Sequence, residues 1–396
     1  MTATGEASWL LFSEDARAGV DGARLVQAAR ELELQELEKD IALESALALL
    51  AVAQARAFEA IERENLSLTY ADLAAAESRR AAGTGSRADV ARLRARISRD
   101  RQALVAAYEA RRGAEIRFNR LLDRPLDQQI LPVIDEAESA ARQANDPAET
   151  LPLPLEATVR TPAAFDGLGA KLLTLAEAQA PEIAAAQRLL EAREREVLAA
   201  RRAFYLPTAF ASASLATRLA EGGVGREPPT PPGAEGLFPL PPDTSWSLGV
   251  GVELPILTGG ARAARRARAE LDRDATELLL DRARQQVEER LRLALLGLET
   301  AYETRLQAQR AAQAAEEAFE VVEDAYAQGL ENLTTLLDAQ RELRVARRSQ
   351  AAATYAALAR WHEVERATGG ELDDAALSRI QSRLQEHDSN PPEKTP

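Results

Sequence analysis

The stretch Gly329-Leu-Glu-Asn-Leu-Thr-Thr-Leu-Leu-Asp-Ala-Gln340 ends one very long helical run and opens a shorter one. A related stretch, Gly83-Thr-Gly-Ser-Arg-Ala-Asp-Val90, has the same place between a long run and a short one. The two glycines are 246 residues apart, which indicates a duplication of about half a chain rather than a short solenoid repeat. We therefore expect two copies of a long helical hairpin and an architecture built by symmetry.

Each predicted hairpin joins a long helix to a shorter returning helix. Residues 16–80 and 261–328 contain no proline, so each predicts one helix of roughly 100 Å at ~1.5 Å per residue. The composition agrees, because Ala, Arg, Leu and Glu dominate the chain, as they do in long helices and coiled coils. The returning helices are expected at residues 87–122 and 332–368.

The apolar positions of the first long helix form two opposed stripes. One face carries Leu34, Leu37, Ile41 and Ala48, and nearly the opposite face carries Leu32, Leu43, Leu47 and Leu50. A two-stranded coiled coil needs only one stripe, so two stripes indicate neighbours on both sides, as in a wall of helices. A buried helix in a globular bundle is the alternative, although few bundles are this long.

Two short segments change the hydrophobic period from 3.6 to 2 residues. They cover residues 208–216 and 247–254, and in the second Leu248, Val250, Val252 and Leu254 alternate with glycine or glutamate. This pattern predicts a pair of strands with one apolar face and one small or polar face. Aromatic residues are 4% of the chain, yet several gather here: Phe204, Tyr205, Phe210, Phe238 and Trp246. A soluble hairpin packed on the helices would explain the alternation, but the aromatic residues favour a membrane barrel, whose interfaces they line.

Composition excludes several kinds of site. The net charge of −14 argues against nucleic acid as a partner, since a phosphate-binding protein needs a basic face. The absence of cysteine excludes disulfides, zinc thiolates and cysteine nucleophiles. The two histidines, His362 and His387, lie in no metal-ligand pattern, and Gly83-Thr-Gly-Ser86 lacks the lysine of a phosphate loop. We therefore expect no catalytic residues, no cofactor and no metal, and set aside a helical enzyme.

Two further expectations concern the membrane and the chain start. No run of about 18 apolar residues is evident, so no transmembrane helix is expected. The segment Met1-Thr-Ala-Thr-Gly-Glu-Ala-Ser-Trp9 has no basic or apolar region of a secretory signal.

With these elements in this order, the chain resembles the outer-membrane efflux proteins, the TolC-like channel-tunnels, over about residues 10–369. The matching pieces include Tyr205-Leu-Pro207 before a strand, Leu254-Pro-Ile-Leu-Thr-Gly-Gly260 after one, and Phe118-Asn-Arg-Leu-Leu122 at a helix end. The resemblance implies a mainly α fold with a small β part, in which duplicated hairpins form a trimeric α-barrel and the strands join an outer-membrane β-barrel.

The resemblance also implies a function and partners. The chain would be the exit duct of a tripartite efflux or type I secretion system, in the outer membrane and projecting into the periplasm. Its partners would be two further copies, a periplasmic adaptor, an inner-membrane pump and outer-membrane lipid. A soluble coiled-coil periplasmic adaptor or scaffold is the alternative, although adaptors usually carry one hairpin with flanking β-rich segments.

The resemblance assigns each part of the chain a place. The parts are a hairpin remnant (1–13), a first helical hairpin (14–124, tip 83–86), an equatorial connector (125–180), an upper helix (181–206), a β-hairpin (207–257) with an extracellular loop (217–245), a second helical hairpin (258–369, tip 329–332) and a disordered tail (370–396). The 125–175 stretch is rich in proline and is expected to be mostly irregular.

Site residues follow from the same resemblance. The tip turns that would contact the adaptor are Gly83, Gly85, Ser86, Gly329 and Leu330, the pore-entrance acids are Asp89 and Asp338, and the membrane strand residues are Phe210, Trp246, Leu248, Val250, Val252 and Leu254. Family members can pair two acids near the tip, but the 246-residue offset aligns Asp89 with Thr335 and Arg92 with Asp338. Asp89 would alternatively be a favourable acid in a first helical turn, and Asp338 a solvated acid paired with Arg341.

The two halves of the duplication differ at their starts. A helix at 182–204 and two strands precede the second long helix, whereas about nine residues precede Leu10-Leu-Phe-Ser13 in the first half. We expect that the sequence begins late, without its signal, first upper helix and first strand; a degenerate paralogue is the alternative.

Overall fold

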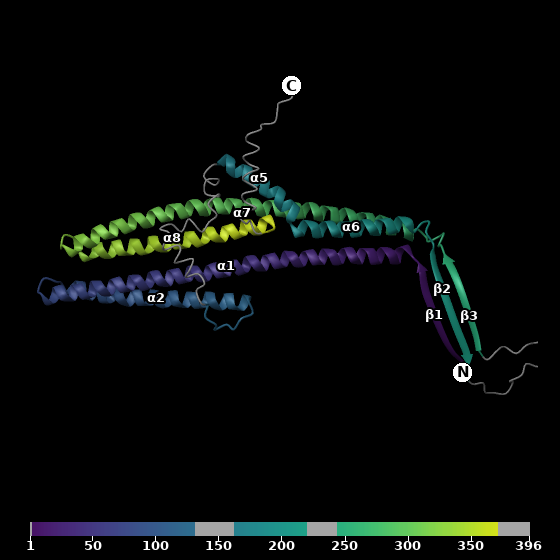
Figure 1. Cartoon of the computed structure of the whole chain (residues 1–396), viewed down its shortest axis with the longest axis horizontal. Helices are drawn as coiled ribbons and strands as arrows, with labels where there is room; N and C mark the ends of the chain where they lie inside the picture. The colour runs from purple at the N-terminus through teal and green to yellow at the C-terminus, as the bar shows by residue number, and fades with distance from the viewer. Residues whose placement is uncertain (1, 131–161, 220–243, 371–396) are drawn as a thin grey trace, which may run out of the picture. The chain divides into compact units, whose positions relative to one another are not determined.

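The computed structural model describes residues 2–130, 162–219 and 244–370. The chain divides into two compact units, formed by residues 1–33 with 182–283 and by residues 34–181 with 284–396. The long helices α1 (Glu14–Ala81) and α7 (Ala261–Ala327) are unbroken and pass through both units (Figure 1). Their bounds differ by at most two residues from those predicted by the proline-free runs.

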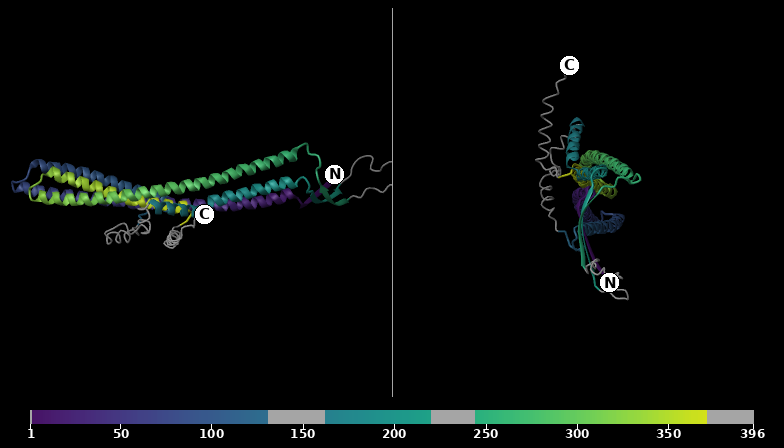
Figure 2. Two further views of the ribbon diagram at one scale, coloured as in Figure 1. Left: turned by 90° about the horizontal axis from the view of Figure 1, so that it is seen from above. Right: turned by 90° about the vertical axis from the view of Figure 1, so that its right-hand side faces the viewer.

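The second unit contains two helical hairpins that lie side by side with their turns at the same end (Figure 2). In one, α1 turns at Gly83 into α2 (Arg87–Leu121), and in the other α7 turns at Gly329 into α8 (Leu333–Thr368). Both glycines have positive φ, 82° and 78°, a conformation that glycine adopts without steric cost.

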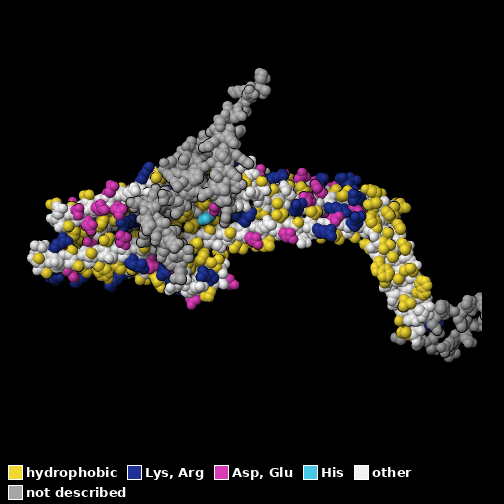
Figure 3. Space-filling model, viewed as in Figure 1, with side chains coloured by type: hydrophobic (Ala, Val, Ile, Leu, Met, Phe, Trp, Pro, Cys, Tyr) yellow, Lys and Arg dark blue, Asp and Glu magenta, His cyan; other side chains and the backbone are white. Residues whose placement is uncertain are grey.

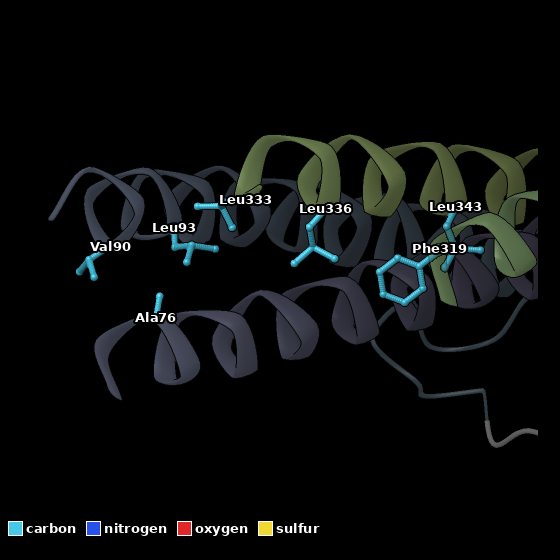
Figure 4. Close-up of a cluster of buried hydrophobic side chains, with 7 residues drawn as sticks. All are labelled: Ala76, Val90, Leu93, Phe319, Leu333, Leu336 and Leu343. Carbon is cyan, nitrogen blue, oxygen red and sulfur yellow. The ribbon is translucent and has the colours of Figure 1, made fainter. Parts of the chain in front are cut away.

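An apolar cluster joins the two hairpins below the turns (Figure 4). Its buried members come from all four helices: Ala76 of α1, Val90 and Leu93 of α2, Phe319 of α7, and Leu333, Leu336 and Leu343 of α8. Burial of each large side chain contributes roughly 1.5–3 kcal/mol, so this cluster holds the turns together. A second cluster, Val52, Ala55, Ala114 and Phe118, joins α1 to α2 further along.

The first unit contains a three-stranded antiparallel sheet and helix α6 (Pro181–Arg202) beside the starts of α1 and α7. The strands lie in the order β1 (Thr2–Phe12), β2 (Thr208–Arg218) and β3 (Thr244–Glu253). The predicted strand pair is therefore present, and β1 pairs with the other edge of β2. Most of the expected extracellular loop and tail, and half of the expected connector, lie outside the described residues.

Two features of the structure were not expected from the sequence. The proline-rich connector was expected to be mostly irregular, but it contains α5 (Pro162–Gln179). Its proline lies at the first helical position, where the missing N–H costs nothing. The next proline is Pro181, and in between Leu168, Leu172 and Ala176 are buried at helical spacing.

The second feature concerns hydropathy. Helix α1 contains an 18-residue window that is apolar enough, by length and composition, to cross a membrane, and 17% of it is buried. The cause is the alanine-rich stretch Ile41-Ala-Leu-Glu-Ser-Ala-Leu-Ala-Leu-Leu-Ala-Val-Ala53, in which small methyl groups raise the average without a continuous run of large apolar side chains.

Candidate functional site

The two turns present exposed backbone at one end of the hairpins. The Oγ of Ser86 accepts a hydrogen bond from the Ala88 N–H at 3.0 Å and caps α2. The Oδ1 of Asn332 caps α8 by accepting from the N–H groups of Thr334 and Thr335. Leu330 is largely exposed between these caps, so the second turn carries an apolar side chain at its apex.

Gly85 in the first turn is fixed by a close backbone approach. A Cβ atom at this position would lie 2.5 Å from the backbone nitrogen of Arg80, which is closer than real Cβ contacts allow. The tip residues predicted from the sequence thus occupy two tight turns, and each turn depends on glycine geometry.

Polar contacts link the two hairpins just below the turns. The guanidinium of Arg79 on α1 lies 4.3 Å from the ring centre of Tyr326 on α7, a cation–π contact. Gln340 on α8 donates a 2.6 Å hydrogen bond to the carboxylate of Asp72 on α1. Together these contacts tie α1 to both helices of the second hairpin.

Two carboxyl groups of this region have a pKa above its ordinary value. Burial raises the pKa of the Asp72 carboxyl, and the hydrogen bond from Gln340 and the charge of Arg79 offset only part of this effect. Burial also raises the pKa of Glu323 on α7, and the negative charges of Asp72, Asp324 and Glu320 add to it. Acidic groups on two hairpins therefore repel one another next to the apolar cluster.

The two predicted entrance acids lie on the same end of the hairpins. Asp89 is half-buried in the first turn of α2. Burial raises the pKa of the nearby Tyr326 phenol, the charge of Arg79 lowers it, and the charges of Asp72 and Asp89 raise it further. Asp338 on α8 is exposed. Among the described residues it has no ion pair, so the alternative pairing with Arg341 does not form. These two acids come from different hairpins.

Sequence reasoning missed the buried acid Glu62. It is fully buried on α1, where its carboxylate accepts from Arg344 at 3.2 Å and from Arg348 at 2.7 Å, both on α8. The sequence carried a signal for it, because Ala55, Glu62, Thr69 and Ala76 recur every seven residues along α1. All four are buried in the structure. Polar residues on such a stripe indicate a partner across the interface, because an unpaired buried charge is very costly.

The sheet of the first unit has one apolar face and one polar face. On β3 the apolar face carries Trp246, Leu248, Val250 and Val252, and Trp246 and Val250 are 76% and 75% exposed. Leu215, Ala213, Ala211 and Ala209 of β2 lie opposite them in register. Hydrophobic side chains gather along the sheet (Figure 3). The predicted strand residue Leu254 follows β3 directly.

The other face of the sheet is small and polar. Ser214 and Ser247 share a 2.9 Å hydrogen bond between their hydroxyl groups, and Ser212 lies opposite Gly249. Phe210 belongs to this face and not to the apolar one, because its register partner is Gly251. A Cβ atom at Gly251 would clash with the ring of Phe210, so the glycine leaves room for it.

Within the three described ranges, no group of three or more histidine, aspartate or glutamate side chains could hold a metal ion.

The comparisons with known proteins agree with this arrangement. The family model of the outer membrane efflux protein matches residues 172–370. No curated protein matches the sequence. Among solved structures, the outer membrane protein VceC from Vibrio cholerae is similar at 17% identity with a TM-score of 0.65, covering 94% of this chain and 80% of that one. The MtrE outer membrane channel of Neisseria gonorrhoeae (18%, 0.67) and the CmeC outer membrane channel of Campylobacter jejuni (14%, 0.61) are similar over 94% and 96% of this chain and 80% of each of theirs.

Proposed function

The chain belongs to the outer membrane efflux protein family, and from this membership we propose that it is the outer-membrane channel of a tripartite efflux or type I secretion system. Transport through it would be passive. Cargo would pass along the helical part across the periplasm and leave through the barrel to which the sheet contributes.

The apolar face of the sheet is the observation that carries the proposal. Large apolar side chains cover β3, and β2 places apolar or small residues opposite them. In water this face would be an exposed hydrophobic patch, whereas in a bilayer it is the lipid side of a barrel wall. A soluble adaptor would leave it against water, so that interpretation is set aside.

We propose a homotrimer because the sheet cannot stand alone in lipid. Within the described sheet, β1 and β3 are edge strands, and their unpaired N–H and C=O groups would cost several kcal/mol each in hydrocarbon. Pairing with the edges of neighbouring copies satisfies these groups and closes a barrel. Exposed leucines on the long helices, such as Leu278 and Leu293, would then contact the neighbouring copies.

The turns at Gly83 and Gly329 are proposed as the periplasmic tip that meets an adaptor protein. Leu330 supplies an exposed apolar contact there, and three copies each of Asp89 and Asp338 would surround the entrance with carboxylates, which attract cations. The free energy for opening would come from tighter binding of the adaptor to the open arrangement of the hairpins than to the closed one. A ligand shifts an equilibrium between two states only by the difference in its affinity for them.

The experiment that tests the function places a charge on each face of the sheet. Val250→Asp puts a carboxylate on the apolar face, where a charge that faces lipid is destabilising, so outer-membrane insertion and channel conductance should be reduced. Ser247→Asp is the matched control on the polar face of the same strand, and it should insert normally. Equal behaviour of the two variants would remove the barrel assignment.

A further inference from the structure

Arginines gather where the helices of the first unit meet the sheet. Residues 261–268, at the start of α7, contain four arginines and no acid. Helix α6 ends with Arg201 and Arg202, a few residues before β2 begins. Figure 3 shows dark-blue side chains at the helix ends next to the yellow sheet. This concentration contrasts with the net charge of −14 for the whole chain.

Arg201, Arg265, Arg266 and Arg268 are exposed, although acids lie near them, and Arg202 and Arg262 are partly buried. Arg268 is 84% exposed and lies 3.7 Å from Asp272, the longest of the ion pairs described in this unit. Arg266 pairs with Glu270, which also accepts from Arg201, so one carboxylate serves two guanidinium groups. Arg265 pairs with Asp15 and Arg202 with Glu14. The six arginines therefore outnumber the four carboxylates that pair with them, and exposed pairs of this kind contribute little.

The start of α7 is an electrostatically unfavourable place for arginines, and the exposed ion pair of Arg265 with Asp15 offsets this cost only in part. The positive end of the helix dipole lies at the start of α7, where acids are favoured and cations are not. The start of α1 follows this rule with Glu14 and Asp15, but the first turn of α7 has no acid and carries Arg262. An external anion would remove this cost.

The arginines adjoin the apolar surface of the sheet. Tyr205 lies between α6 and β2 and is mostly exposed, and Ile256 and Leu257, between β3 and α7, are almost fully exposed. From sheet to helix the surface therefore changes from apolar strands to apolar or aromatic side chains and then to arginines. This order matches a bilayer from hydrocarbon through the interface to the phosphate layer.

We propose that the arginines at the start of α7 and the end of α6, Arg201, Arg202, Arg262, Arg265, Arg266 and Arg268, form a collar that binds phospholipid phosphates of the bilayer leaflet facing the helices. This inference rests on the proposed function, because the sheet must lie in the membrane. Guanidinium groups bind phosphate oxygens in a bidentate manner, so the collar would favour anionic phospholipids and fix the depth at which the sheet sits.

The test measures co-flotation of the full chain with vesicles of phosphatidylcholine alone or mixed with phosphatidylglycerol. The wild-type protein should bind both, and bind the anionic vesicles more strongly in a salt-sensitive way. The double variant Arg266→Gln/Arg268→Gln should lose the preference by roughly five-fold for each arginine removed. Replacement of both by lysine, which keeps the charge, should restore most of it.

Arg63→Gln/Arg292→Gln is the matched control, since both arginines are exposed, form i,i+4 ion pairs and lie in the second unit. It should leave the lipid preference unchanged. The inference is overturned if the wild-type protein binds both vesicles equally, or if the control loses as much preference as the collar variant. Failure of the wild-type protein to float with either vesicle would instead overturn the proposed function.

Discussion

At the residue scale, the functionally informative contacts join positions that are far apart in the sequence. Asp89 and Asp338 were predicted as entrance acids from motif and offset alone. The environment of Asp72 could not be predicted in this way, because it depends on Gln340, which is 268 residues away and donates to its carboxylate. The same holds for Glu62 with Arg344 and Arg348. Spacing along one helix reveals which polar residues are buried, but not which residue of another helix will satisfy them.

The raised pKa of Asp72 leads to a stability prediction. Because burial raises this pKa in the folded state, the charged carboxylate destabilises the fold above that pKa, and the penalty disappears as the pH falls through it. Asp72→Asn should therefore raise the thermal unfolding midpoint at neutral pH, by on the order of 1 °C since the site is partly solvated. The gain should vanish in acid.

Asp127→Asn is the comparison for this effect, because Asp127 is exposed and lies outside the helices. It should leave the midpoint unchanged at every pH. If Asp72→Asn lowered the midpoint throughout, the hydrogen bond from Gln340 and the charge of Arg79 would outweigh the burial penalty.

At the scale of elements, the long periodic helices and their turns could be predicted from the sequence, whereas the short helix α5 and the sheet face of a strand residue could not. The proline-free runs set α1 and α7 to within two residues, and glycine marked both turns. Helix α5 was missed because prolines on either side disguised a helix that begins at one of them. Phe210 was predicted as a strand residue, but which face of the sheet it belongs to depends on the register with Gly251.

Replacing glycine by alanine should lower the free energy of unfolding at the turn residue Gly83 and raise it at Gly19 inside helix α1. Gly83 has a φ of 82°, so Gly83→Ala should cost roughly 1–2 kcal/mol through the left-handed conformation. Gly19 lies inside α1 with open space around a built Cβ, so Gly19→Ala should stabilise by about 0.5–1 kcal/mol. Chemical denaturation of both variants checks this, and a Gly83→Ala variant as stable as wild type would show that the turn relaxes.

At the scale of the whole molecule, the duplication predicted the plan of two hairpins, since a repeat in sequence implies a repeat in structure. It could not predict what the exposed apolar surfaces meet. The long helices were expected to have neighbours on both sides from the opposed stripes, and Leu34, Leu37 and Ile41 of one stripe are indeed exposed in the single chain. A sequence shows that such a surface exists, but the partner is a property of the assembly.

The trimer is the last prediction, and leucines on α7 test it. Leu293 is 60% exposed, and its burial against a neighbouring copy would contribute roughly 1.5–3 kcal/mol in each interface. Leu293→Gln should therefore shift the detergent-purified protein from trimer toward monomer, as measured by sedimentation. Arg292→Gln changes the adjacent exposed position, whose ion pair with Glu288 lies within the helix, and it should leave the trimer intact. Because the sheet edges also need partners, a monomeric wild-type protein in detergent would remove both the interface and the closed barrel.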